Sequence, residues 1–97
     1  MSQPDQDKAD RELRAKVLRY FDRQLPAGQQ AFNPAEVARA ISCSTPHVHH
    51  LIEAAQKGQP GLVATDIALP GAKHMWRVHR ATLVRYMAKN SNIPTSL

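Results

Sequence analysis

Residues 33–58 constrain the fold of this chain more than any other segment, because two helix-start signals follow each other closely there. Asn33 precedes Pro34 at a first helical position, and Glu36 stands three residues after Asn33, which is the pattern of a capping box. Ser44 marks the second start, where Pro46 is tolerated because the first N–H groups of a helix have no partner within it. The segment therefore predicts two short helices joined by a tight turn.

Apolar residues recur at helical spacing in both parts of this segment, which predicts one buried face on each helix. The first helix ends near residues 41–42, and the second covers residues 44–57 before Gly58 ends it in a left-handed conformation. Helix pairs of this kind often place their second helix in the major groove of DNA. The apolar stripes are Val37, Ala38 and Ile41 in the first helix, and Val48, Leu51, Ile52 and Ala55 in the second.

The N-terminal third predicts one more helix, over residues 10–25. Asp10 is a suitable N-cap, and the turn formers at residues 26–28 end the periodic pattern. Residues 1–9 are polar without periodicity, which predicts a disordered tail, and residues 28–32 read as a linker. The apolar positions of this helix are Leu13, Val17, Leu18, Phe21 and Leu25.

After residue 58 the periodicity changes from helical to alternating. Residues 62–69 and 75–79 alternate apolar with polar side chains around a turn at residues 70–72, which predicts a β-hairpin over residues 62–79. Residues 81–89 return to helical spacing, and residues 90–97 read as a flexible tail. The predicted fold is mainly α with a β-hairpin, in one domain over residues 10–89. Its expected core is Leu13, Val17, Phe21, Val37, Ile41, Val48, Leu51, Ile52, Ile67, Trp76, Val78, Leu83 and Met87.

Composition favours an ordinary globular domain, with 42% hydrophobic and 22% charged residues among 97. The single cysteine excludes an internal disulfide, the N-terminus lacks the apolar segment of a signal peptide, and no run is long enough to span a membrane. We therefore expect a cytoplasmic protein. The net charge of +5 is concentrated after residue 31, where seven Lys/Arg face three Asp/Glu. Such a surface attracts nucleic acid, although an ordinary basic surface remains an alternative.

Specific residues resemble the winged helix-turn-helix domain of bacterial regulators. They are Ala35, Glu36, Val37 and Ala38, followed by Ser44, Val48, Leu51 and Ile52. A second group resembles the wing end of excisionase-like proteins, and consists of Trp76, Arg77, Val78, Arg80 and Leu83. The resemblance covers about residues 12–88 and implies the order helix, helix, turn, helix, hairpin, helix.

The resemblance implies sequence-specific binding of double-stranded DNA, by a transcriptional regulator or by a mobile-element accessory factor for excision or plasmid maintenance. The hydroxyl of threonine and neutral imidazole can both donate and accept hydrogen bonds, which base reading requires. The expected base-reading residues are Thr45, His47, His49 and His50. The expected contacts to the DNA backbone, partly from the hairpin as a wing, are Arg39, Ser44, Lys57, Lys73, His74, Arg77 and Arg80.

Other interpretations of these residues stay open. The three histidines could form a solvated helix face, Arg77 and Arg80 could be exposed charges of a strand and a helix start, and Trp76 suits a core better than a base-stacking platform. A winged-helix protein–protein adaptor is the alternative function.

The expected partners are double-stranded DNA and a second copy of the chain, paired through the helices at 10–25 and 81–89, on a nucleoid-associated protein. We expect no membrane contact and no small-molecule ligand, since no separate ligand domain is present.

Zinc is the metal to consider, because Cys43, His47 and His50 are close along the chain and cysteine and histidine are its usual ligands. A fourth ligand is missing unless His74 or His79 folds back, so we expect no metal and no cofactor. Catalysis is not expected either, because the chain lacks a glycine-rich phosphate loop and an oriented acid–base set.

Overall fold

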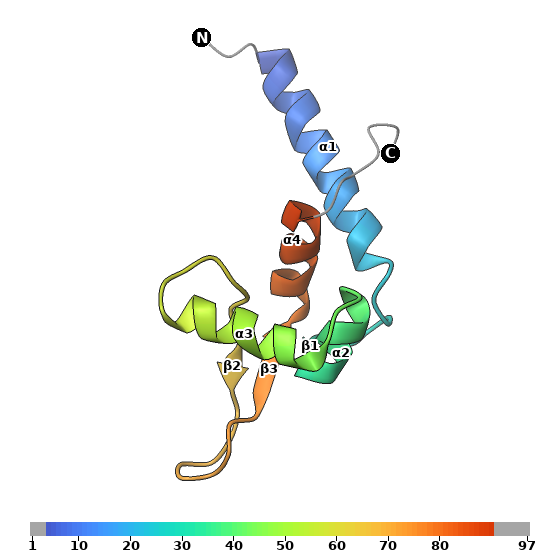
Figure 1. Cartoon of the computed structure of the whole chain (residues 1–97). Helices are drawn as coiled ribbons and strands as arrows, with labels where there is room; N and C mark the ends of the chain where they lie inside the picture. Colours follow the sequence, from blue (N-terminus) through green and yellow to red (C-terminus); the bar gives the residue numbers. More distant parts are fainter. Residues whose placement is uncertain (1–3, 91–97) are drawn as a thin grey trace.

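The structure, a computed structural model, describes residues 4–90, with side chains from residue 8 onward. This part of the chain is mainly helical, with a small three-stranded antiparallel sheet (Figure 1). The predicted tail at 90–97 lies outside the described residues apart from Asn90, which ends the last helix. In chain order the elements are α1 (Pro4–Asp22), β1 (Ala31–Phe32), α2 (Pro34–Ala40), α3 (Thr45–Gln56), β2 (Thr65–Asp66), β3 (Trp76–His79) and α4 (Arg80–Asn90).

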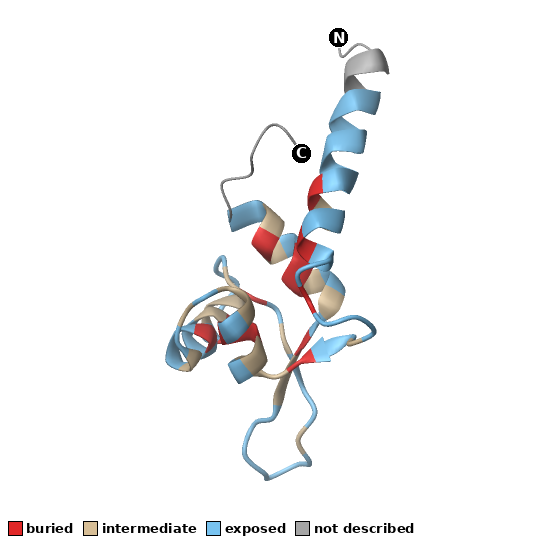
Figure 2. Cartoon of the chain, turned by 90° about the vertical axis from the view of Figure 1, so that its right-hand side faces the viewer, coloured by how far each residue is buried: buried red, intermediate tan, exposed pale blue. Residues whose placement is uncertain are grey.

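Strand β3 lies at the centre of the sheet, between β1 and β2. Phe32 of β1 pairs with Val78 of β3, and on the other edge Thr65 of β2 pairs with Arg77. Both views place α1 and α4 at one end of the molecule, while the loop between β2 and β3 projects from the opposite end (Figures 1 and 2). The sequence did not predict β1, because a strand of two residues is too short to show alternation.

The two helix starts predicted in residues 33–58 are confirmed. The backbone N–H of Glu36 donates to Asn33 Oδ1 at 2.8 Å, and the N–H of Asn33 donates to Glu36 Oε1 at 3.0 Å, which completes the capping box. The N–H of His47 donates to Ser44 Oγ at 3.3 Å. Ser42, at a φ of 56°, makes the turn between the helices, and Gly58 ends α3 at a φ of 75°.

Helix α1 differs from its prediction at both ends. It begins at Pro4 instead of Asp10, so the predicted tail is wrong for residues 4–9, whose backbone is helical. Proline is tolerated in a first helical turn, and no residue from 5 to 9 breaks a helix. The helix ends at Asp22, and residues 23–25 form a tighter turn in which the N–H of Leu25 donates to the carbonyl of Asp22.

The core gathers where α1, α4, the sheet and the α2–α3 pair meet, and the outer part of α1 remains exposed (Figure 2). Most of the predicted core is confirmed, with Ile41, Leu51 and Trp76 half-buried at its edge. The prediction is wrong for Leu13 and Ile67, because 47% and 52% of their surfaces are exposed. The buried residues are Val17, Phe21, Leu25, Phe32, Val37, Ala38, Val48, Ile52, Leu62, Val78, Leu83, Val84 and Met87.

Leu62 is buried in the core, whereas Ile67, which the alternation predicted there, is exposed. Gly61 lies so close to α3 that a Cβ atom there would be 2.3 Å from the carbonyl oxygen of Leu51. This close approach lets the N–H of Leu62 donate to the same oxygen at 3.0 Å and turns the Leu62 side chain inward. The hairpin consequently begins later than predicted, and its outer part leaves the core.

Arg80 joins the beginning of α4 to the end of α1. Its Nε donates to Asp22 Oδ1 at 2.6 Å, and only 12% of its side chain is exposed. The other two guanidinium nitrogens donate to four backbone carbonyls, at the end of α1 and in the loop that follows it. These carbonyls belong to Asp22 at 2.7 Å, Leu25 at 3.5 Å, Pro26 at 2.5 Å and Gln29 at 2.9 Å. The backbone N–H of Arg80 also donates to the backbone carbonyl of Gln30 at 2.8 Å.

The Arg80→Ala variant should lower the free energy of unfolding by about 3 kcal/mol, because it removes the hydrogen bonds of the guanidinium group to the Asp22 carboxylate and to four backbone carbonyls. Arg80→Lys should restore only part of this loss, since an ammonium group cannot reproduce the planar guanidinium geometry. Urea denaturation measures both. The control is Arg85→Ala, an exposed arginine on the same helix that should change the stability by less than about 0.5 kcal/mol. Equal losses for Arg80→Ala and Arg85→Ala would contradict the structural role of Arg80.

Candidate nucleic-acid interface

The four predicted base-reading residues all lie on α3. Val48 and Ile52 face the core, and His47, His49 and His50 are exposed, while Thr45 is half-buried at the start of the helix. Glu53 is exposed as well, and it follows His49 by four residues and His50 by three, so its carboxylate shares their part of the helix surface. A carboxylate can accept a hydrogen bond from the amino group of cytosine, which adds Glu53 to the groups on this face that can contact bases.

The predicted backbone contacts are spread over several elements. Arg39 lies exposed near the end of α2, Lys57 is the C-cap of α3, and Lys73 is exposed in the loop between β2 and β3. Ser44 is exposed, and its side-chain oxygen accepts a hydrogen bond from the backbone N–H of His47. Its role in this structure is therefore the N-cap of α3. Three lysine or arginine side chains thus remain exposed around α3 and the loop.

Arg77 is half-buried on β3, where its Nη1 donates to the carbonyl oxygen of Trp76 at 2.8 Å. The positive charge of Arg77 is close enough to the carboxylate of Glu36 to lower the pKa of that group. The hydrogen bond from the backbone N–H of Asn33 lowers the pKa of Glu36 most, followed by that from Gln29 Nε2 at 2.8 Å, and the charges of Arg39 and Arg77 lower it further. The start of α2 thus holds a carboxylate that is already hydrogen-bonded and lies near the positive charges of Arg39 and Arg77.

Arg80 is engaged within the fold, whereas the sequence suggested a contact to the DNA backbone. Its guanidinium nitrogens donate to the carboxylate of Asp22 and to carbonyls at the end of α1, and little of the side chain is exposed. A phosphate contact would require these bonds to break. The sequence could not reveal this, because the acceptors lie more than fifty residues away along the chain.

Residues 65–77 form a projecting two-stranded segment, here called the arm, whose base is organised by Asp66. Asp66 Oδ1 accepts from the N–H groups of Ala68 and Met75, each at 3.0 Å, and Oδ2 lies 2.6 Å from Nδ1 of His74. These bonds, with that from His74 the strongest, lower the pKa of Asp66 to about 2. The His74 ring also stacks on Trp76 at 5.0 Å between ring centroids, with 20° between the ring planes.

His74 is therefore part of the internal structure of the arm, although the sequence suggested a contact to DNA. Trp76 is half-buried and packs against the core, with one face covered by the imidazole ring. Asp66 was not among the candidate residues. Its signal in the sequence is that it is the one acidic residue from 62 to 79, within an otherwise alternating run.

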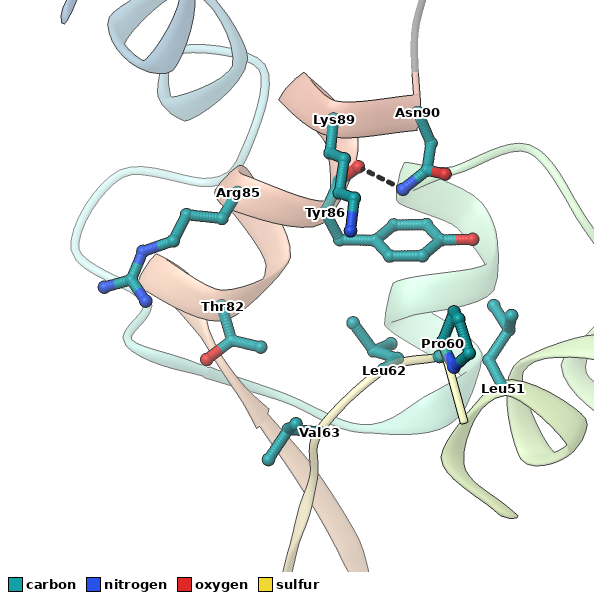
Figure 3. Close-up of a pocket in the computed structure, with 10 residues that line it drawn as sticks. Leu51, Pro60, Leu62, Val63, Thr82, Arg85, Tyr86, Lys89 and Asn90 are labelled. Carbon is teal, nitrogen blue, oxygen red and sulfur yellow. Dashed lines mark hydrogen bonds between the residues drawn. The ribbon is translucent and has the colours of Figure 1, made fainter. Parts of the chain in front are cut away.

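A groove of about 380 Å³ lies between α3, the loop that follows it and α4 (Figure 3). Leu51, Leu62 and Val63 supply apolar lining, while Arg85 and Lys89 add positive charge. Asn90 Nδ2 donates to the carbonyl of Tyr86 at 2.9 Å at its edge. The lining contains no carboxylate, histidine or cysteine, and we assign no reaction to it.

Within residues 4–90, no three histidine, cysteine or acidic side chains come together in a way that could hold a metal ion. Cys43 is half-buried, and its thiol donates to the carbonyl of Ser44 at 3.4 Å. None of the described helices has the length and hydropathy needed to cross a membrane. Comparisons of the chain with models of protein families, with curated proteins and with solved structures found no match.

Replacing His74 by alanine should raise the pKa of Asp66 from about 2 towards its ordinary value of 3.8, without reaching it because the two backbone donors remain. NMR titration of the Asp66 side-chain carboxyl measures this change. Since the pKa is lower in the folded arm, ionised Asp66 stabilises the fold above pH 3.8, and this contribution is lost as the pH falls to about 2.

The matched control is His79→Ala, which removes an exposed histidine from β3, beyond the arm. It should leave the Asp66 titration unchanged. An unchanged pKa of Asp66 in the His74→Ala variant would show that the imidazole does not hold the carboxylate.

Proposed function

We propose that this protein binds double-stranded DNA as a winged helix-turn-helix protein, with α3 in the major groove and the arm as the wing. The observation that carries the proposal is the exposed polar face of α3, on a helix that is capped and held by α2, next to a projecting basic arm. Its role would be that of a transcriptional regulator or of a mobile-element accessory factor.

The distribution of charge supports this function. Arg39, Lys57 and Lys73 are exposed, whereas two of the three acidic residues after residue 31 have their oxygens bound within the fold. These are Glu36 in the capping box and Asp66 in the arm. Phosphate groups would therefore meet three exposed basic side chains on this side, which favours sequence-independent attraction to DNA.

The face of α3 supports base contacts more than phosphate contacts. Imidazole can donate to or accept from base edges, and Glu53 can accept from cytosine, whereas the helix lacks the arginine that most often contacts guanine. Phosphate contacts position a protein on DNA and base contacts select the sequence. In this protein the two tasks would be divided between the surrounding lysine and arginine residues and α3.

The protein should bind a short mixed-sequence duplex at low salt, with an affinity that falls steeply as the salt concentration rises. Lys73→Ala should weaken binding to all sequences and reduce the slope of log K against log salt by about 1, because one phosphate contact is lost. His49→Ala should instead change the order of preference among sequences selected from a random pool. Fluorescence anisotropy and sequencing of the bound pool measure the two effects.

Lys89→Ala is the control, since it removes the same charge from α4, outside the proposed interface, and should keep the salt slope of the natural protein. Absence of binding at low salt would reject the proposal in favour of a winged-helix adaptor that binds proteins. Loss of stability is excluded as a cause by measuring the unfolding of each variant.

We further propose that two copies of the protein pair through α1 and α4. Residues 8–16 of α1 are exposed, and a groove of about 570 Å³ between α1 and α4 is lined in part by Leu13, Val17 and Ala88. Acidic residues stand towards the start of α1, as at Glu12, and basic residues towards its end, as at Arg19. Antiparallel pairing of two α1 helices would bring these opposite charges together and cover Leu13.

Leu13→Glu should weaken dimerisation by about tenfold or more, equivalent to ~1.4 kcal/mol, because it places a charge in the apolar contact. Sedimentation velocity over a range of concentrations measures the change. Ala15→Glu, on the opposite side of the same helix, is the control and should dimerise like the natural protein. A natural protein that stays monomeric throughout the range would refute this pairing.

A further inference from the structure

Exposed apolar side chains are concentrated in and beside the arm. Of the six large hydrophobic residues that are exposed among those described, four lie in the segment from residue 63 to residue 75. Leu69 is the most exposed, at 79% of its surface. Large apolar groups held in water at the end of a projecting segment usually mark a contact with another molecule. The four residues are Val63, Ile67, Leu69 and Met75.

Two of these apolar side chains share one face of the arm with the positive charge of Arg77. Thr65 pairs with Arg77, and the N–H of Ile67 donates to the carbonyl of Met75 at 2.9 Å, so the antiparallel register continues beyond β2. Side chains alternate between the two faces of such a ladder, and directly opposed residues share a face. The face that results carries Ile67, Met75 and Arg77, and the other face carries Asp66 and Trp76, together with His74, which contacts both.

The tip of the arm is a tight turn with little freedom. The N–H of Ala72 donates to the carbonyl of Leu69 at 3.0 Å, Pro70 occupies the second position, and Gly71 has a φ of 84°. This combination is that of a type II turn, in which proline fixes one dihedral angle and glycine supplies the positive one. Leu69 and Pro70, both exposed, therefore stand together at the narrow end of the arm.

The base of the arm is also fixed before any partner binds. The carboxylate of Asp66 joins both strands through its bonds to Ala68, His74 and Met75, and His74 stacks on Trp76, which packs against the core. A segment that is ordered in advance loses less conformational entropy on binding than a flexible loop. The apolar tip is thus presented as a rigid projection.

Charge favours DNA as the partner of this tip. Asp66 is the one acidic residue from 62 to 79, against Lys73 and Arg77, so the segment carries an excess of positive charge. Arg77 lies on the same face as Ile67 and Met75, and Lys73 is exposed near the tip. Proteins that bind the minor groove often insert leucine or proline between base pairs and kink the duplex, while basic side chains hold the phosphates.

We propose that the arm inserts Leu69 and Pro70 as a wedge between two base pairs from the minor groove and kinks the DNA. This inference rests on the proposed DNA binding and adds a deformation of the bound duplex to it. Lys73 holds a neighbouring phosphate, while Ile67 and Met75 cover the unstacked bases. Pyrimidine–purine steps such as TA unstack most easily, so the wedge favours them without any hydrogen bond to a base.

The test uses a short mixed-sequence duplex with a central TA step, a fluorescent adenine analogue at that step and a donor–acceptor dye pair at its ends. The natural protein should increase the fluorescence of the analogue, which reports unstacking, and shorten the distance between the ends. The Leu69→Ala/Met75→Ala variant should lose both signals. Its affinity should fall by less than about tenfold, because the wedge contacts and the energy spent on bending disappear together.

Val63→Ala is the matched control, since it removes a similarly exposed apolar side chain just before the arm, and it should keep both signals. Binding by the natural protein without unstacking or shortening would overturn the wedge and leave DNA binding intact. Absence of binding would overturn DNA binding and the wedge together. Retention of both signals by the double variant, with a change in its oligomeric state, would show that the arm contacts protein instead.

Discussion

The guanidinium group of Arg80 is the interaction on which the arrangement of this fold depends. It lies between the end of α1 and the beginning of α4, and it donates to the carboxylate of Asp22 and to backbone carbonyls at the end of α1 and in the following loop. Its backbone N–H binds Gln30, just before β1, so the same residue also fixes the strand that leads into α2. Because β3 runs directly into α4, the position of Arg80 sets how the sheet, and with it the arm, meets the helices.

Much of the fold could be predicted from the sequence wherever the signal is local. The caps at Asn33 and Ser44 are formed by neighbouring residues, and the structure confirms both. Contacts between distant residues could not be predicted. Alternation placed Ile67 in the core, but the close approach of Gly61 to α3 brings in Leu62, and nothing near Arg80 in the sequence indicates that its acceptors lie on α1.

The candidate site shows the same division. Exposure of the α3 histidines followed from helical periodicity, because a helix that buries Val48 and Ile52 must turn its other side outward. The role of His74 did not follow, since it depends on Asp66 from the other strand and on stacking with Trp76. Residues that looked like independent DNA contacts are thus partly the means by which the arm keeps its shape.

An α3 without arginine and an arm with an apolar tip suggest one consistent mode of recognition. Contacts from imidazole discriminate bases less strongly than the paired hydrogen bonds of arginine with guanine, so α3 alone would leave specificity incomplete. A rigid wedge adds discrimination by a different route, because the energy needed to unstack a base step depends on the sequence of that step. In such a protein, Leu69 and Pro70 would select DNA by how easily it deforms, and the histidines of α3 would fix where along the groove the deformation occurs.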